Sequence, residues 1–340
     1  METITDNVRT HYTGDDGSNL ATRVRTLLET FGPGPIPPER LAAFDHFHVR
    51  GAEATADLAR LAEVQPDWIV LDAGSGLGGP SRYLAQHYGC HVEGVDLTPA
   101  FVEVAGLLAE RAELAGRLTY RVGDVTALPF EGAGFDLVWC EHVAMNIADR
   151  PKLYRELRRV LKPGGLLAFY DVVSMAGSPA PLYPLPWSET PAASFLLTRE
   201  ATLDAVRASG FAVQTERDVS PEGLAWFQRT MGAAPQGPNL ALVMGPHGGD
   251  GPQPRAKSAS GKPRFTDGAG ESYLDSKSGA RYPVRQTTRA SFPVVGRPSP
   301  ADRTLPSSRD CCFAELPDTE CSCRRGKRSA GCQDCCNSRA

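Results

Sequence analysis

The sequence predicts a doubly wound α/β fold, in which helices cover both faces of a mainly parallel sheet. From Trp68 onward, short apolar runs alternate with amphipathic stretches that are long enough to be crossover helices. The runs are nearly continuous, as in strands buried on both faces, and they are WIVLD, HVEGVD, LTYRVGD, FDLVWCE and GLLAFYDVV. A glycine-rich turn between the first run and a helix is typical of sheets that bind a ligand at the carboxyl ends of their strands.

Residues 1–64 are predicted to form an N-terminal helical cap. The segment NLATRVRTLLETFG has helical spacing of its apolar residues, which are Leu20, Val24, Leu27, Leu28 and Phe31. The Gly and Pro residues that follow end this helix. A second helix is expected in RGAEATADLARLAEV, where Ala54, Leu58 and Leu61 share one face.

Residues 65–245 are predicted to form the α/β domain itself. Thr98 and Pro99 mark the start of one helix, and the segment LKPGG marks the end of another. A Pro-rich insertion at residues 174–195 follows the fifth strand, and we expect it to lie as a lid over the carboxyl ends of the strands. A helix in TREATLDAVRASG and a sixth strand in FAVQTERDV complete the domain.

Residues 246–340 lose the hydrophobic periodicity and are rich in Gly, Pro, Ser and Arg. This composition buries too little apolar surface to offset the entropy of ordering, so we predict a disordered tail with no candidate for a further strand. Seven of the nine cysteines lie in the last thirty residues, in C-x-C and C-x-x-C pairs that a zinc knuckle would use. Their irregular spacing and few apolar neighbours favour a frameshifted or fused tail over a zinc module.

Charge separates the same two parts of the chain. Residues 1–244 carry 20 Lys and Arg against 30 Asp and Glu, whereas residues 245–340 carry 16 against 10. An acidic domain argues against a nucleic-acid surface, which needs clustered positive charge, and a small-molecule partner is expected instead. The oligomeric state does not follow from these patterns.

The chain shows no membrane span and no secretory signal, so we expect a cytoplasmic protein. No run approaches the roughly 20 apolar residues of a membrane helix, and the charged N-terminus lacks the apolar centre of a signal peptide. Cys90 and Cys140 are isolated beside strand ends, which predicts reduced core residues rather than a disulfide framework.

The glycine-rich turn VLDAGSGLGGPSRYLA is the strongest local signal for a binding site. Gly74, Gly76 and Gly78 let the backbone pass close to a ligand, and the following helix N-terminus offers free N–H groups to a carboxylate. The spacing of Gly74, Gly76 and Gly79 also fits the dinucleotide motif G-x-G-x-x-G. The turn alone therefore leaves the cofactor open.

Acidic residues at three strand ends narrow the choice. Asp72 precedes the turn and is placed for the ammonium group of a zwitterionic ligand, whereas it would repel a pyrophosphate. Asp96 ends the second strand, where a carboxylate accepts hydrogen bonds from ribose hydroxyls in many cofactor sites. Asp124 follows the third strand and suits recognition of an adenine amino group.

These segments resemble the class I S-adenosylmethionine-dependent methyltransferases. The resemblance is to the type 11 group, which includes sarcosine/dimethylglycine, tocopherol, sterol and quinone-pathway methyltransferases. It extends from about His46 to Val219 and rests on DHFHVRG, LDAGSGLGGPSRYLA, GVDLTP, GDVTALPF, FDLVWCEHVAMNIAD and RVLKPGG. It implies a Rossmann-like fold, the cofactor S-adenosylmethionine and a small-molecule methyl acceptor. It also implies the cofactor contacts, which are Asp72, Gly74, Gly76, Asp96, Leu97, Asp124 and Val125, with backbone from Cys140.

His142, just past the fourth strand, is the best candidate for a catalytic base, because imidazole titrates near neutral pH. An equally strong interpretation makes it a structural histidine. Glu141 is placed to hold a cationic acceptor or to orient His142. Methylation of an amine needs only an unprotonated nitrogen, whereas a phenol or carbon acid needs a base.

The acceptor pocket is expected to include His46, His48, Asn146 and Trp187. The two histidines also fit packing against the lid, and Trp187 also fits a plain packing role. No third ligand accompanies the H-x-H pattern, so no metal site is predicted. Amine N-methylation is slightly favoured, because EHVAMNIADR resembles the sarcosine/dimethylglycine enzymes. The alternatives are C- or O-methylation of a lipid-like or natural-product acceptor, a nicotinamide-dependent oxidoreductase, and an inactive cofactor-binding protein.

Overall fold

The computed structural model describes residue 8, residues 20–231 and four short strands between residues 272 and 296. All of these belong to the first of two compact units, Met1–Pro300. The cysteine-rich end of the predicted tail, and with it the zinc alternative, lies outside the described residues.

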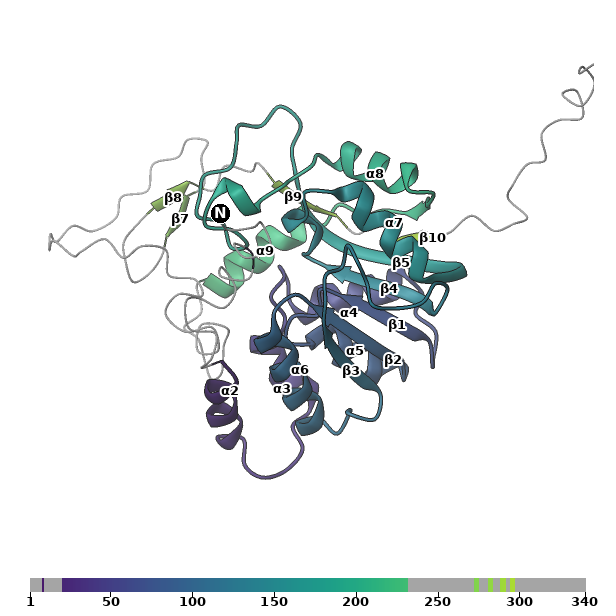
Figure 1. The fold of residues 1–340 in the computed structure, drawn as a ribbon. Helices are drawn as coiled ribbons and strands as arrows, with labels where there is room; N and C mark the ends of the chain where they lie inside the picture. The colour runs from purple at the N-terminus through teal and green to yellow at the C-terminus, as the bar shows by residue number, and fades with distance from the viewer. Residues whose placement is uncertain are drawn as a thin grey trace, which may run out of the picture. The chain divides into compact units, whose positions relative to one another are not determined.

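The predicted doubly wound sheet is confirmed (Figure 1). Five strands pair in parallel in the order β3-β2-β1-β4-β5. They are β1 (Ile69–Ala73), β2 (His91–Asp96), β3 (Leu118–Val122), β4 (Phe135–Glu141) and β5 (Leu161–Ser174). Each matches a predicted apolar run, and the order reverses direction between β1 and β4, which opens a crevice at their carboxyl ends.

The expectation that the tail offers no further strand is wrong: four short strands are described there, and two of them join the main sheet. β10 (Val294–Gly296) lies between β5 and β6 (Ala212–Thr215) and is antiparallel to both. β9 (Thr288–Ser291) pairs antiparallel with the carboxyl end of β5. No periodic signal marks these strands, because three or four residues show too little alternation of apolar and polar side chains. β7 (Ser272–Leu274) and β8 (Arg281–Pro283) form a separate two-stranded ladder.

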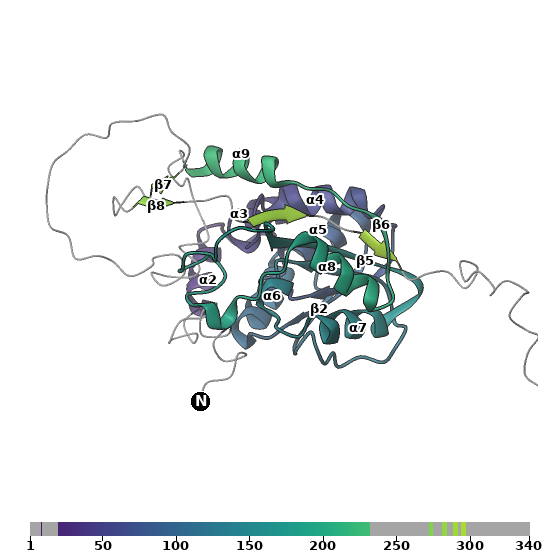
Figure 2. The same ribbon diagram turned by 90° about the horizontal axis from the view of Figure 1, so that it is seen from above.

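Helices cover both faces of the sheet, as predicted (Figure 2). On one face α4 (Ala52–Leu61) and α5 (Gly79–Tyr88) pack through Leu58 and Leu84 onto Leu137 and Trp139 of β4. On the other, α7 (Arg150–Val160) and α8 (Arg199–Ala208) pack onto a second core. Consecutive β4 residues alternate between these cores, which fixes the register of the site at the strand's end.

The N-terminal helices pack beside α6 (Pro99–Arg111). The predicted first helix is α2 (Leu20–Glu29), and its buried residues join Phe101, Val104 and Leu108 of α6 in one cluster. Two helices were not predicted. They are α3 (Pro38–Asp45), which starts after the Gly and Pro string, and α9 (Ser220–Met231). Both begin at or beside a proline, which suits a first helical turn as well as a loop.

Candidate functional site

The carboxyl ends of β1, β2 and β4 bring the predicted acidic residues together. Asp72, Asp96 and Glu141 lie close enough for the charges of Asp96 and Glu141 to raise the pKa of Asp72 further, after burial as the main cause. The pKa of Asp72 reaches about 7, and its Oδ2 accepts a hydrogen bond from the Ser81 hydroxyl at 2.5 Å. A ligand group with a positive charge would therefore be strongly favoured beside the Asp72 carboxylate.

The glycine turn has the backbone that only glycine adopts without strain. Gly74, Gly76 and Gly78 have φ values of +82°, +52° and +76°. A Cβ on Gly74 would lie 2.2 Å from Val143, and one on Gly78 would lie 2.4 Å from the Tyr120 hydroxyl. The backbone of the turn therefore packs tightly against Val143 and Tyr120, and no side chain would fit at Gly74 or Gly78.

Asp96 holds the turn in place through backbone hydrogen bonds. Its Oδ2 accepts from the Gly76 N–H and its Oδ1 from the Thr98 N–H, both at 2.9 Å. Burial raises the pKa of Asp96, and these two hydrogen bonds oppose the rise. Thr98 occupies the predicted N-cap position of α6, but its side chain makes no capping bond; the Asp96 carboxylate instead accepts from the Thr98 N–H, before the first helical turn.

The remaining predicted cofactor contacts lie around the same edge. Asp124 is exposed two residues past β3, and its Oδ1 accepts from the Thr126 N–H at 2.7 Å. Leu97 is half-buried and Val125 is buried. Cys140 is a free thiol that points into the core opposite Glu141, so only its backbone faces the site.

Glu141 is paired with His48 rather than with His142. Its Oε2 accepts hydrogen bonds from the Thr55 hydroxyl at 2.9 Å and the Trp139 indole at 3.0 Å, and lies 3.2 Å from His48 Nε2. Burial alone would raise the pKa of Glu141, but His48 outweighs it and lowers the pKa. The pKa of His48 is correspondingly raised by Glu141 against the effect of burial. The pair is therefore ionic, and Glu141 orients His48.

His142 has a strained backbone, with φ at +53°, and its N–H donates to the Tyr170 carbonyl at 2.7 Å. Its ring lies 5.8 Å from the His48 ring, centre to centre. Burial first, and then the His48 charge, lower the pKa of His142 well below its usual range. A neutral ring at the end of β4 can accept a hydrogen bond, but it is a weak proton acceptor.

His46 belongs to a buried ion network that the sequence did not reveal. Its Nδ1 lies 2.6 Å from Asp45 Oδ1, and the other oxygen of Asp45 accepts from Arg82 Nη2 at 2.6 Å. Burial opposes ionisation of Asp45, but Arg82 and His46 hold its pKa below the usual range. Asp45 and Arg82 are 37 positions apart, so the sequence holds no signal for their pairing. The one signal that it does hold is the position of Arg82, a charged residue on the buried face of the helix after the turn.

Asn146 and Trp187 connect the insertion to the end of β4. The Asn146 amide donates to the backbone carbonyls of Trp187 and Ala193, at 3.0 and 2.7 Å. Trp187 is buried against Met145 and Val172. The structure therefore places both residues in the attachment of residues 174–195, and their role toward an acceptor stays a prediction.

Several buried polar atoms around this edge have no hydrogen-bond partner among the described residues. The donors are Arg50 Nη1 and Arg82 Nε and Nη1. The others are Ser75 Oγ, Glu141 Oε1, His46 Nε2 and His142 Nε2. Such atoms cost free energy unless a ligand or water meets them, and their clustering is typical of a binding site.

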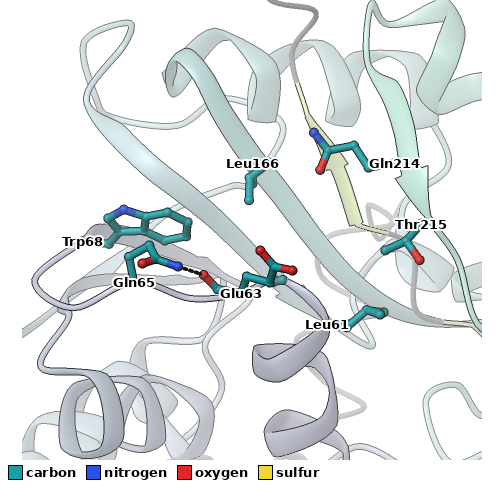
Figure 3. A pocket seen from close by; sticks show the side chains of 8 residues that line it. Leu61, Glu63, Gln65, Trp68, Leu166, Gln214 and Thr215 are labelled. Carbon is teal, nitrogen blue, oxygen red and sulfur yellow. Dashed lines mark hydrogen bonds between the residues drawn. The ribbon is translucent and has the colours of Figure 1, made fainter.

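Metal sites, membrane-spanning helices and other hollows were sought among the described residues. In the part of the chain that the structure describes, no three His, Cys, Asp or Glu side chains are placed to hold a metal ion. Residues 20–231 and the short strands include no helix long and apolar enough to cross a membrane. A hollow of about 380 Å³ lies at the opposite end of the sheet, lined by Leu61, Trp68 and Gln214 among others (Figure 3), and contains no predicted site residue.

Comparison with known proteins identifies the domain. A family model described as "Methyltransferase domain" matches residues 71–169, which include the glycine turn, Asp96, Glu141 and His142. A sterol 24-C-methyltransferase from Gibberella zeae is 36% identical over 114 residues, 34% of this chain and 30% of the relative. A chloroplastic tocopherol O-methyltransferase from Arabidopsis thaliana is 41% identical over 96 residues, 28% of each chain. The chain thus matches less than a third of the length of these two relatives.

A solved structure shows the same fold over a longer stretch. Phosphoethanolamine N-methyltransferase 2 from Haemonchus contortus aligns with 88% of this chain and 61% of its own, with a TM-score of 0.57 and 19% identity. The fold, the matched family model and the curated relatives agree with the resemblance in the sequence. Residues 71–169 are therefore a class I methyltransferase domain, and the cofactor of that family is S-adenosylmethionine.

Proposed function

We propose that the chain transfers a methyl group from S-adenosylmethionine to a small-molecule acceptor. The observation that carries this proposal is the cluster of unpartnered buried atoms beside the glycine turn, at the carboxyl ends of β1 and β4. An edge that was only structural would satisfy these atoms internally. S-adenosylmethionine supplies an electrophilic methyl group on its sulfonium, and the chain's task is to align the acceptor and exclude water.

The residues fit this cofactor. Asp72 suits its ammonium group, because the raised pKa of the buried carboxyl would be lowered again by a cation. Asp96 suits the ribose hydroxyls, since each carboxylate oxygen can accept a further hydrogen bond. Asp124 suits the adenine amino group, with Leu97 and Val125 beside it. The amides that follow the glycine turn suit the carboxylate.

The acceptor side favours an amine. Glu141 Oε1 is shielded from solvent and has no donor among the described residues, although Oε2 accepts from two side chains and pairs with His48. A substrate N–H would satisfy Oε1, and the neutral His142 ring could accept a second hydrogen bond from the same group. The relatives named above include C-, O- and N-methyltransferases, so C- or O-methylation of a lipid-like or natural-product acceptor is the second candidate.

Calorimetric titration of the full chain with S-adenosylhomocysteine and, separately, with NAD tests the cofactor. We expect binding of the first only, since Asp72 would repel a pyrophosphate. Binding of NAD alone would support the oxidoreductase instead.

A panel of amines, phenols and prenyl compounds, with a labelled methyl donor, then tests the acceptor. Transfer to amines is the expected result, and transfer confined to phenols or prenyl compounds would contradict it. Binding without transfer to any compound would favour the inactive cofactor-binding protein.

A further inference from the structure

The Asp45–His46 pair has the geometry of an oriented base, and it lies before residues 71–169, the part of the chain that the family model matches. Asp45 Oδ1 and His46 Nδ1 are 2.6 Å apart, and their side chains are 1% and 4% exposed. The second Asp45 oxygen is held by Arg82, which is fully buried. An ionised carboxylate can only accept, so Nδ1 of a neutral His46 carries the proton and Nε2 carries the lone pair.

The lone pair on Nε2 is shielded from solvent and has no partner among the described residues. The ring is held on its other edge by the start of α5, where a Cβ on Gly79 would lie 2.5 Å from Nδ1. The neighbouring Phe47 packs against Gly76 of the glycine turn: a Cβ added to Gly76 would lie 3.6 Å from the Phe47 ring. The segment of His46 and Phe47 therefore rests directly on the turn that faces the cofactor.

The three histidine rings of the site differ in what they can do with a proton. His48 pairs with Glu141, whose charge raises the pKa of the ring and favours its protonated form, so His48 is poorly placed to take a further proton. His142 lies beside that cation, and its low pKa makes it a weak base. His46 lies 5.5 Å from His48, but it has the Asp45 carboxylate to stabilise a positive ring.

We propose that His46 Nε2 accepts the proton that the acceptor loses on methylation, with Asp45 and Arg82 as positioning residues and His142 as a hydrogen-bond acceptor that orients the substrate. The inference rests on the proposed function. For an amine, an N–H bond of the acceptor breaks and its proton bonds to Nε2. The nitrogen lone pair forms the new N–C bond, and the electrons of the broken S–C bond stay on sulfur. The proton is later lost from His46 to solvent.

Charged groups face His46 from three elements. Asp45 and His48 flank it on its own segment, Arg82 faces it from α5, and Glu141 from β4 acts through His48. Among these groups, Asp45 is the one within hydrogen-bond distance of the His46 ring, so changing Asp45 should alter the tautomer of His46 more than changing any of the others.

The test compares His46→Gln, Asp45→Asn and, as a matched control, His87→Gln, an exposed histidine on α5. The full chain is assayed with the best acceptor of the panel over pH 5 to 10. We expect His46→Gln to lower turnover near neutral pH by about 100-fold or more and to shift the rise of activity to higher pH, with unchanged affinity for S-adenosylhomocysteine. His87→Gln should keep the wild-type pH profile.

Nitrogen-15 NMR of the histidine rings gives a second measurement that needs no turnover. In the wild type we expect the Nδ1–H tautomer at His46, and in Asp45→Asn a shift toward Nε2–H. An Nε2–H tautomer in the wild type, or a wild-type pH profile in a folded His46→Gln variant, would overturn the inference while leaving methyl transfer in place. Absence of S-adenosylhomocysteine binding would overturn the proposed function, and the inference with it.

Discussion

On the glycine-turn side of the candidate site, Asp96 accepts hydrogen bonds from two backbone amides and Asp72 accepts one from Ser81. On the histidine side, the side chains pair mainly with one another. Four of them have a buried polar atom with no hydrogen-bond partner among the described residues: His46, Arg82, Glu141 and His142. The turn is thus shaped by local backbone geometry, whereas the histidine side is shaped by buried charges from distant segments. We expect the two sides to respond differently to substitution.

The histidine side depends on long-range ion pairs for its stability. Arg82→Met should leave the Asp45 carboxylate buried with only His46 beside it, because Arg82 supplies the nearest cation. Breaking a buried ion pair in this way costs about 3 to 5 kcal/mol. Urea unfolding of the cofactor-free protein measures the loss.

A double variant, Arg82→Met with Asp45→Leu, is the control for this prediction. Because it removes both charges, it should recover most of the lost stability. The idea fails if the single variant is nearly as stable as wild type, or if the double variant is no more stable than the single one.

The sequence predicted the glycine-turn side of the site better than the histidine side. The turn, β1 and β2 are contiguous, and Asp96 lies 20 residues from the Gly76 amide it binds, so a short motif contains most of that geometry. The His48–Glu141 contact joins residues 93 positions apart, and a single sequence holds no signal for the pairing. One role that the sequence predicted for Glu141 was to orient His142, its neighbour in the chain, whereas the structure pairs Glu141 with His48.

The missed β10 has a similar cause. Its three residues, Val294–Gly296, complete the sheet only because β5 and β6 leave a place for a strand between them. Tertiary context decides such short strands, since their own preference is weak. For Thr98 the predicted position was correct, since it is the N-cap residue of α6, but its side chain makes no capping hydrogen bond.

The glycine-turn side should show a stability cost that depends on pH. Burial raises the pKa of Asp72 from 3.8 to about 7, so the folded protein binds more protons than the unfolded chain between these values. Its contribution to stability is full below about pH 4 and is lost as the pH rises through 7. Asp72→Asn should therefore be more stable than wild type at pH 8 by about 2 to 4 kcal/mol, and similar to it at pH 4.

Unfolding in urea at the two pH values measures this difference. Asp204→Asn, at a side chain that is 75% exposed on α8, is the matched control and should change little at either pH. A stability gain for Asp72→Asn that is the same at pH 4 and pH 8 would contradict the buried-charge explanation and point to packing instead.

The smallest expected effect is on cofactor affinity, and it distinguishes two carboxylates at strand ends: Asp96, the last residue of β2, and Asp124, two residues past β3. Asp96 is half-buried and already organised by the Gly76 and Thr98 amides, whereas Asp124 is exposed, and among the described residues its side chain accepts from the Thr126 amide. A charge-assisted hydrogen bond is stronger where water is excluded, so Asp96→Ala should weaken binding of S-adenosylhomocysteine by about 1.5 to 3 kcal/mol. Asp124→Ala should cost less than about 1 kcal/mol, because solvent replaces an exposed contact. Calorimetry on both variants decides the order, and equal losses would mean that the ligand buries Asp124 as fully as Asp96.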